Sequence, residues 1–408
     1  DVYKRQIEIS PKDDFDVNGY QRTPEENWEL FSSLKTVQVE AGGNNTAFIK
    51  SDGSLWMSGD NTYGQLCSGN YNNYTVPVKA IGLNNIVDVS IGENHCIALD
   101  SRGSAYLWGN NSAHAVSYSD IRKFSLPTTF PVSNVVSIEA GSQTTFICSS
   151  NGVFVQGVNN YGQLCLENRD VISEQTKIEN IPGQLYKSYG KHTFFNSGAL
   201  VMGCGANDHK IIGEYNLNTI LKPEPVEFSS VYDTGQNHVT IIDEGNNIYV
   251  RGSNKWGQCG IEDINETYSH IDLKLTENIE ITDVKCGKEH TIIKLSDGTV
   301  MTWGYNLRGQ IGDGTHNNRY EPYAVKGMTN ITQIAAGNNH TVALDANGNV
   351  WRWGDNSYGQ FGNGSTVSSN SPINNYYGDL EHKNISSGSN HIFCLLYTSP
   401  SPRDYAAS

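Results

Sequence analysis

One unit recurs along almost the whole chain, and this repetition limits the folds that the sequence can adopt. Its clearest copy spans residues 331–364, ITQIAAGNNHTVALDANGNVWRWGDNSYGQFGNG. The intervals between the glycines that follow the return strand are 50, 48, 46, 49, 52 and 50 residues by subtraction. A near-constant period of this length is typical of a propeller or a solenoid rather than of several unrelated domains. The glycines are Gly59, Gly109, Gly157, Gly203, Gly252, Gly304 and Gly354.

Each copy predicts several short β-strands. An apolar strand such as Ile86–Val89 is followed by a glycine and by a second strand such as HTVAL. A tight turn such as Asp297-Gly298 then leads to a return strand such as Val350–Trp353. Asp-Gly and Asn-Gly between apolar strands are strong hairpin signals, and no helical period persists for more than about two turns. A polar loop with a proline leads to the next copy, at Pro77, Pro131, Pro225, Pro322 and Pro372.

The repeat predicts an all-β chain that folds as a seven-bladed β-propeller with four-stranded antiparallel blades. One sheet cannot cover both of its own faces, and the twist of stacked sheets allows a ring to close. We expect the propeller to occupy residues 36–395, with a leader or linker outside the core at 1–35 and a tail at 396–408. The half-copy Ile385–Leu395 is expected to close the ring against the first blade; the alternative is that the chain is part of a longer array.

The repeated pattern G-x-x-H-T-x-x-L, followed by G-x-V-x-x-W-G-x-N-x-x-G-Q-L-G, resembles the regulator of chromosome condensation repeat. This resemblance covers residues 36–395 and implies seven-bladed propellers of this period. The dipeptides of WD repeats and the double glycine of kelch repeats are absent at their own spacings. Two copies depart from the pattern: residues 113–116 (AHAV) replace GQLG in the second, and no Gly-Gln follows Gly203 in the fourth.

The two ends of the chain resemble translated sequencing-adaptor sequence, in the opening DVYKRQ and the closing LYTSPSPRD. On this interpretation the protein is a bacterial or metagenomic member of the family and its true termini are unknown. A signal peptide is then neither expected nor excluded. The localisation is left open between the bacterial surface, secretion and the cytoplasm.

Charge and composition restrict the possible partners. The 28 basic and 43 acidic side chains give a formal charge of −15, which argues against a duplex nucleic acid as partner. No apolar run reaches the roughly 20 residues that cross a bilayer. We expect the eight cysteines to be small buried residues rather than disulfides or metal ligands, because equivalent positions on neighbouring blades should lie too far apart. Cys67 and Cys165 take the last position of the GQLG motif.

The repeated polar residues predict structure rather than chemistry. We expect the histidines to satisfy backbone groups rather than to bind a metal or an anion, because Asn45 and Thr144 replace them in two copies. We expect the asparagines and glutamines of the N-x-x-G-Q turns to be structural as well. No catalytic motif is present, so we expect no enzyme, no cofactor and no metal site. The repeated histidines are His95, His192, His238, His290, His340 and His391.

The loops of three copies carry aromatic residues that the repeat does not require. Because copies six, seven and one would be neighbours in a closed ring, these loops predict one tyrosine-rich patch beside an arginine. Aromatic residues and arginine are common anchors of protein interfaces. The candidate contact residues are Tyr71, Tyr74, Arg319, Tyr320, Tyr323, Tyr376 and Tyr377.

Three functions remain open at this point. The first is a monomeric scaffold without enzymatic activity that binds a protein, or a glycan, through its loops. The second, implied by the resemblance, is a guanine nucleotide exchange factor for a small GTPase; the inserted β-hairpin and the basic tail of the best-known member are absent here. The third, compatible with the first, is a surface or secreted repeat module.

Overall fold

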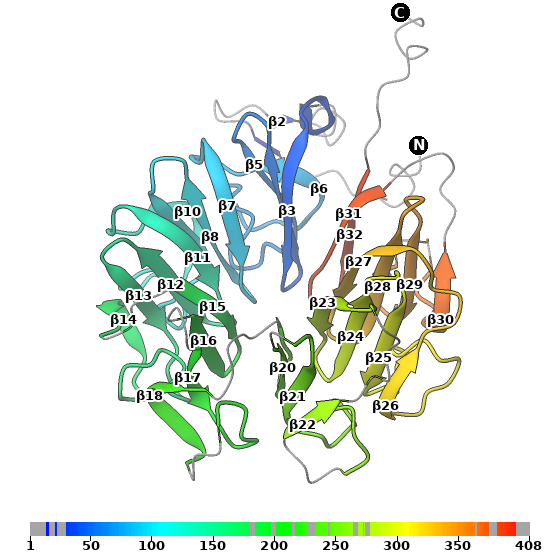
Figure 1. Ribbon diagram of the computed structural model, residues 1–408. Helices are drawn as coiled ribbons and strands as arrows, with labels where there is room; N and C mark the ends of the chain where they lie inside the picture. Colours follow the sequence, from blue (N-terminus) through cyan, green and yellow to red (C-terminus); the bar gives the residue numbers. More distant parts are fainter. Residues whose placement is uncertain are drawn as a thin grey trace, which may run out of the picture. The chain divides into compact units, whose positions relative to one another are not determined.

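The fold is a seven-bladed β-propeller with antiparallel blades of four strands, as the repeat predicts (Figure 1). The chain divides into two compact units, Ile7–Gly245 and Asn246–Ser408 together with Asp1–Gln6. The computed structural model describes residues 14–15, 21–22, 30–179, 181, 184–196, 201–213, 217–226, 233–243, 245–263, 268–271, 273, 278–361, 363, 365–374 and 382–396.

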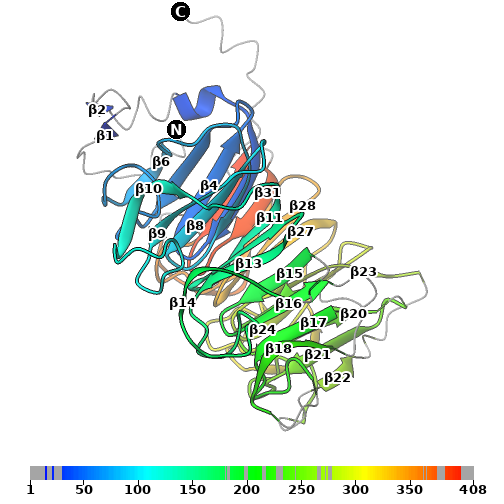
Figure 2. The same cartoon turned by 90° about the vertical axis from the view of Figure 1, so that its left-hand side faces the viewer.

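The unit Ile7–Gly245 contains the first four blades. Within each blade the strands pair in chain order, and Figure 2 shows β10, β9 and β8 side by side in the second blade. A short pair of strands, β1 (Asp14–Phe15) and β2 (Gln21–Arg22), precedes the blades. The blade strands are β3 (Thr36–Gly42), β4 (Asn45–Lys50), β5 (Leu55–Gly59) and β6 (Tyr74–Lys79); β7 (Ile86–Ile91), β8 (His95–Asp100), β9 (Ala105–Asn110) and β10 (Lys123–Thr129); β11 (Val135–Ala140), β12 (Thr144–Ser149), β13 (Gly152–Gly157) and β14 (Ile172–Lys177); β15 (Gln184–Tyr189), β16 (His192–Asn196), β17 (Val201–Ala206) and β18 (Thr219–Pro225).

The unit that begins at Asn246 contains the sixth and seventh blades. The boundary between the units falls inside the fifth blade, so β19 (Asp233–Thr234) and β20 (His238–Ile242) belong to the preceding unit. The remaining strands are β21 (Ile248–Gly252) and β22 (Tyr268–Ile271); β23 (Ile281–Cys286), β24 (His290–Leu295), β25 (Val300–Gly304) and β26 (Arg319–Ala324); β27 (Ile331–Ala336), β28 (His340–Asp345), β29 (Val350–Gly354) and β30 (Ser369–Asn374); and β31 (His382–Ser387) with β32 (Ile392–Leu396).

The fourth strand of each blade lies where the sequence predicts a polar loop. Pro77, Pro322 and Pro372 are inside β6, β26 and β30 rather than in connections. In each of these strands the proline is the last residue of a short stretch across which the pairing register shifts, so it lies in a bulge of the ladder. Proline is tolerated because the fourth strand is the edge of its sheet and a bulge needs no ladder hydrogen bond.

Two alignments made from the sequence are wrong by one or two residues. In the fourth blade His192 pairs with Gly205, as His340 pairs with Gly354, so Gly205 rather than Gly203 is the repeated glycine. In the second blade the GQLG motif corresponds to residues 114–117. The amide of His114 bonds to the carbonyl of Asn111, as the amide of Gly64 bonds to Asn61 in the first blade.

The segment before the first blade contributes to the core. Phe31 is only 8% exposed and packs edge-on against the rings of Phe48 and Trp56. The ammonium of Lys50 lies 3.3 Å from the centre of the Phe31 ring. The expectation that residues 1–35 lie outside the core is therefore wrong for Phe31. At the other end, Ile385 of β31 packs in a cluster with residues of the seventh blade, whereas closure against the first blade stays a prediction.

Consecutive blades are joined by a buried backbone carbonyl. The carbonyl oxygen of Gln310 in the sixth blade accepts hydrogen bonds from the indole Nε1 of Trp353 (2.8 Å) and the hydroxyl of Thr341 (2.9 Å), both in the seventh. The Nε2 of His290 lies 3.1 Å from the Thr341 hydroxyl. Because that hydroxyl proton is already donated to the carbonyl, His290 is the donor in this contact.

We call this set of hydrogen bonds to a buried carbonyl of the preceding blade a joint. It recurs between other blades, in one case with glutamine in place of tryptophan. Trp303 donates to the carbonyl of Gln258 (3.0 Å), and Trp108 donates to that of Gln65 (2.7 Å). Where the third blade has Gln156 in place of tryptophan, its Nε2 donates to the carbonyl of Ala115 (2.9 Å). Each joint therefore satisfies a polar group that burial would otherwise leave unpaired.

The cysteines follow the expectation only in part. Cys67, Cys96, Cys148 and Cys259 are buried and do not take part in disulfides, as expected. Cys165 and Cys204 instead form a disulfide, with their Cα atoms 5.6 Å apart. The expectation fails because the two residues do not hold equivalent positions in their blades: Cys165 lies in a loop and Cys204 in the return strand of the next blade.

His95, His290 and His340 have the predicted structural role, because the ring of each contacts a buried or half-buried hydroxyl group. His95 donates from Nε2 to the hydroxyl of Thr145 at 3.1 Å, and that hydroxyl donates to the carbonyl of Ala115. His340 lies 2.8 Å from the hydroxyl of Ser387 in the same way. Burial lowers the pKa of His95, His192 and His340 to about 4, so these rings are neutral at pH 7.

We expect Trp353→Ala to lower the free energy of unfolding by about 3–5 kcal/mol, because the ring is fully buried and its hydrogen bond to Gln310 is lost. Chemical denaturation measures this loss. Trp256→Ala is the matched control, because that ring is only half-buried. The prediction fails if the two variants are equally stable.

We expect the protein to lose stability as the pH falls from about 6.5 to about 4. In this window the histidines of the unfolded chain take up protons while His95, His192 and His340 stay neutral, so the unfolded state binds more protons and is favoured. Each buried histidine should lower the free energy of unfolding by about 2 kcal/mol when the pH falls from 7.5 to 5.

His95→Asn isolates one such contribution, because Asn45 holds the same position in the first blade. Urea denaturation of the variant and the parent at both pH values gives the difference. An identical pH dependence for the two proteins would contradict the assignment.

Candidate interaction surface

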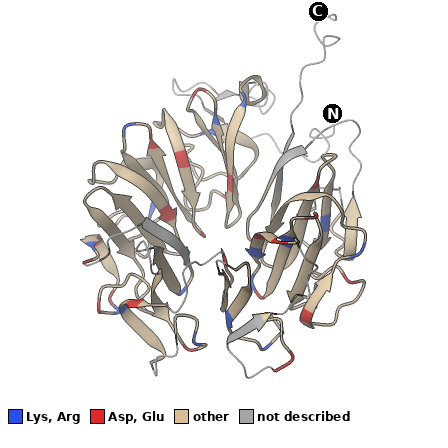
Figure 3. Ribbon diagram, in the orientation of Figure 1, with Lys and Arg blue, Asp and Glu red and all other residues tan. Residues whose placement is uncertain are grey.

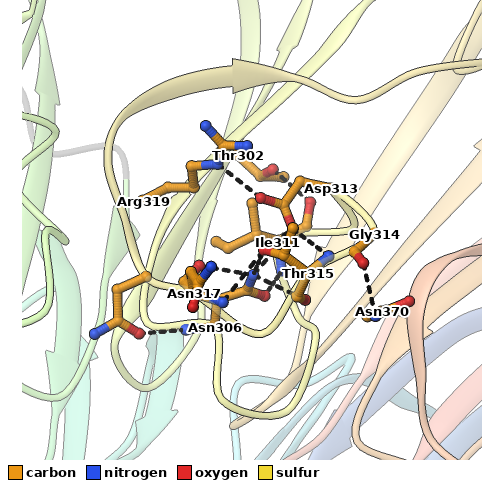
Figure 4. Close-up of polar contacts among 10 residues, drawn as sticks. Thr302, Asn306, Ile311, Asp313, Gly314, Thr315, Asn317, Arg319 and Asn370 are labelled. Carbon is orange, nitrogen blue, oxygen red and sulfur yellow. Dashed lines mark hydrogen bonds and ion pairs between the residues drawn. The ribbon is translucent and has the colours of Figure 1, made fainter.

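The loop between the third and fourth strands of the sixth blade, residues 305–318, is the best-defined candidate surface (Figure 4). It ends at Arg319 and Tyr320, the first two residues of β26, and Tyr323 follows in the same strand. All three side chains are half-buried. The structure therefore brings together the three candidate residues that the sequence places in the sixth copy.

Asn306 determines the shape of this loop. Its side-chain oxygen accepts the amide of Ile311 (3.0 Å), and its Nδ2 donates to the carbonyl oxygen of Asn317 (2.9 Å) and to Asp313 Oδ1 (3.1 Å). The amide of Asn306 donates to the side chain of Asn318 at 2.9 Å. One buried side chain thus bridges both ends of the loop, so the asparagine is structural here, as the repeat predicts.

Arg319 is held on two sides. Its Nε donates to Asp313 Oδ2 at 2.7 Å, and its guanidinium lies 4.8 Å from the centre of the Tyr323 ring. The side chain of Asp313 is 0% exposed, whereas that of Arg319 is 42% exposed. Burial raises the pKa of Asp313, but hydrogen bonds from Thr315 and Arg319 outweigh it and hold the pKa below the usual carboxyl value. Arg319 is therefore a positioned cation facing an ionised, buried carboxylate.

The loop is also attached to the seventh blade. Asn370 of β30 donates from its side chain to the carbonyl of Gly314 at 2.9 Å. Gly309, with φ +85°, lies so close to β30 that a Cβ there would be 2.6 Å from the Cα of Asn370. These contacts make the loop a rigid platform, and rigid loops commonly carry binding sites.

The other candidate residues do not all fit the predicted patch. Tyr71 is 43% exposed, and the ammonium of Lys123 lies 4.2 Å from the centre of its ring. Tyr74 is buried in β6 and accepts a hydrogen bond from Asn70, so its expected place in an exposed loop is wrong. Both belong to the unit Ile7–Gly245, so a patch shared with Arg319 stays a prediction. Tyr376 and Tyr377 lie outside the described residues.

A second set of aromatic residues is not among the candidates predicted from the sequence. Trp256 packs edge-on against Tyr305 with ring centres 5.5 Å apart, and the ammonium of Lys255 lies 4.7 Å from the Trp256 ring. Tyr358 is 75% exposed. The sequence signal that could have found them is an aromatic residue directly before Gly-Gln, which is present in four copies. The backbone amide of this aromatic residue donates to the glutamine side chain, as Tyr358 does to Gln360 at 2.8 Å.

Nothing in the described part of the chain resembles a catalytic centre. No group of three or more His, Cys, Asp or Glu residues in it could hold a metal ion. A pocket of about 10 Å³ between the second and third blades is lined by His95, Ala115 and Ser142 and admits about one water molecule. It lies where Ala115 replaces the glutamine of the other turns. None of the described helices has the length and apolar character needed to cross a membrane.

Known proteins with related sequences belong to one repeat family. The regulator of chromosome condensation (RCC1) repeat matches residues 36–65, 86–114, 281–310 and 331–360, and a second form of it matches 52–99, 297–344 and 347–395. The ultraviolet-B receptor UVR8 of Arabidopsis thaliana is 24% identical over 310 residues, which cover 72% of this chain and 70% of the receptor. The X-linked retinitis pigmentosa GTPase regulator of Homo sapiens is 32% identical over 316 residues, which cover 73% of this chain.

The chain spans only part of several of these relatives. It matches 30% of the length of the retinitis pigmentosa regulator and 5% of the human E3 ubiquitin-protein ligase HERC2, to which it is 23% identical. Among solved structures, Prp20p of Saccharomyces cerevisiae aligns with a TM-score of 0.68 at 18% identity, over 93% of this chain and 96% of that chain. Human WBSCR16 aligns with a TM-score of 0.66 at 17% identity, over 85% and 98%. With the repeat matched in both units and the blades in place, the chain belongs to the regulator of chromosome condensation repeat family of seven-bladed β-propellers.

Proposed function

We propose that this protein is a scaffold without enzymatic activity that binds a protein partner through the loops between the third and fourth strands of its blades. The observation that supports this most is the platform around Arg319. The residues that recur in register have structural roles. Asparagines shape the loops, and histidine, threonine and tryptophan form hydrogen bonds between blades. The side chains exposed on these loops include Tyr71, Tyr358 and Leu307 as well as the positioned Arg319.

The surface of the sixth blade suits a protein partner. Arg319 presents a cation whose Nε is already held by Asp313, so little side-chain freedom is lost on binding. Tyr320, Tyr305 and Trp256 lie on the same or the neighbouring loop and add aromatic area. Tyrosine, tryptophan and arginine are the residues that most often dominate the binding energy of interfaces. A glycan that stacks on the same rings is the other class of partner.

The net charge of the chain further restricts the class of partner. The formal charge of −15 favours a neutral or cationic partner over nucleic acid. Figure 3 shows basic residues interspersed among acidic ones along the blades. We therefore expect a partner whose contact surface is largely neutral, with a carboxylate opposite Arg319.

The alternative function is guanine nucleotide exchange on a small GTPase. The study of Prp20p concerns its binding to Gsp1p and histones, and this chain has the same fold. Against exchange, each described strand from β3 to β30 is one of the four strands of a blade, and the longest connection between successive strands of a blade is residues 253–267. Between β3 and β30 no described strand is left over to form an inserted hairpin, and the pairs β1–β2 and β31–β32 lie before and after the blades.

We expect the double variant Arg319→Ala, Tyr320→Ser to weaken partner binding at least tenfold, which corresponds to about 1.4 kcal/mol. The partner is first captured with the purified propeller, identified, and then titrated as a purified protein by calorimetry. Tyr118→Ser is the control, because Tyr118 is 69% exposed in the second blade. If the double variant and the parent bind the partner with equal affinity, the sixth blade is not part of the interface.

The tyrosines of the seventh copy are tested separately. We expect Tyr376→Ser, Tyr377→Ser to weaken the same complex if the patch predicted from the sequence is real. The melting temperature and circular dichroism should match those of the parent, because the sequence predicts a polar loop at these positions. Unchanged binding would restrict the surface to the sixth blade and its neighbour.

We expect the purified protein not to accelerate nucleotide release from small GTPases. The measurement is the loss of a fluorescent guanine nucleotide from a panel of GTPases at substoichiometric concentrations of the propeller. Rapid nucleotide release from one of these GTPases would contradict the scaffold function and favour the exchange-factor function.

A further inference from the structure

We propose that Cys165 and Cys204 form a covalent joint between the third and fourth blades, in place of the tryptophan joint used elsewhere, so that the stability of this protein depends on oxidising surroundings. The pair is separated by 39 positions in the sequence and lies within the unit Ile7–Gly245. This inference is independent of the proposed partner.

The two cysteines hold two repeated positions that face each other across a blade boundary. Cys204 pairs with Thr193 in its sheet, as Trp353 pairs with Thr341, so Cys204 stands in the tryptophan position. Cys165 is the last residue of the GQLG motif, the position of Gly312. In the sixth blade a Cβ on Gly312 would lie 2.8 Å from the Nε1 of Trp353, so the two positions are in contact there.

The disulfide makes up for a weaker joint. The carbonyl of Gln163 accepts the hydroxyl of Thr193 at 2.8 Å, as in the other joints, but the indole donor is replaced by Cys204. A cysteine also leaves much of the tryptophan volume unfilled. Phe195 is completely buried beside it in the same cluster, where the second and seventh blades have the alanines Ala98 and Ala343.

Cys67 is a natural comparison within the same unit. It holds the same position as Cys165 and has the same backbone conformation, with φ 55° against 58°. Its counterpart in the next blade is Trp108, which keeps its hydrogen bond to the carbonyl of Gln65. The thiol near Cys67 is that of Cys96, which lies in the same core cluster, and the two cysteines form no disulfide. A cysteine at this position is therefore compatible with a tryptophan joint and forms a bond only where the tryptophan is also replaced.

Formation of the bond is a two-electron oxidation. A thiolate of one cysteine attacks a disulfide of an oxidant, either a small-molecule disulfide or an oxidised dithiol protein, and the second thiolate displaces it. One S–S bond forms between Cys165 and Cys204, the oxidant's disulfide is reduced to two thiols, and two protons pass to them. Cys165 is 3% exposed and Cys204 is 0% exposed, so the exchange must take place before the two blades pack. Such bonds persist in extracellular and other oxidising surroundings.

The first test counts free thiols. Parent protein folded with oxidised and reduced glutathione is denatured without reductant, alkylated with iodoacetamide and weighed by mass spectrometry. Of the eight cysteines, we expect six to be alkylated, and all eight after reduction. Cys67→Ala should lower both counts by one, whereas Cys165→Ser, Cys204→Ser should give six in both conditions. Alkylation of all eight cysteines in the unreduced parent would overturn the proposal.

The second test measures what the bond contributes. Protein folded in dithiothreitol should melt about 5 °C or more below protein folded in the glutathione mixture, because the cross-link restricts the unfolded chain. The double serine variant should melt at one temperature under both conditions, and Cys67→Ala should keep the full difference. Equal melting temperatures for oxidised and reduced parent would mean that the joint does not depend on the bond.

Discussion

The packing of neighbouring blades depends on buried backbone carbonyls within the long loops, such as those of Gln65, Gln258 and Gln310. In the joint between the sixth and seventh blades, Gln310 accepts both the indole of Trp353 and the hydroxyl of Thr341. Leaving such a group unpaired in the interior costs about 1–3 kcal/mol, so a blade that slipped by one residue would lose every joint it makes. Hydrophobic packing holds the blades together, and these directional bonds determine their register.

This constraint explains why so much of the repeated sequence has no part in chemistry. His290 is used to orient Thr341, and Asn306 is used to shape the loop that carries the carbonyl. What differs from blade to blade is the outer part of each loop, where Arg319 and Tyr320 lie. Relatives in this family include a light receptor, a GTPase regulator and ubiquitin ligases, which agrees with one scaffold serving several functions.

The joint tolerates substitution when the carbonyl keeps a partner or the chain gains another link. Gln156 replaces tryptophan with an amide that reaches the carbonyl of Ala115. The Sγ of Cys204 lies 3.6 Å from the carbonyl oxygen of Gln163 but has no proton to donate once oxidised, and the disulfide to Cys165 connects the same two positions. Each solution satisfies the same geometric requirement between neighbouring blades with different chemistry.

The sequence by itself determined the propeller, the number of blades, the hairpin turns and the structural roles of the histidines and asparagines, because these depend on a pattern that recurs in register. It predicted four strands in each blade but did not locate the fourth, since an edge strand such as β26 (RYEPYA) is half-exposed, polar and interrupted by Pro322. Only the tertiary structure decided that Tyr74 is buried and that Cys165 meets Cys204. Both depend on contacts between residues that no local period relates, and the positions of those residues are known only once the blades are stacked.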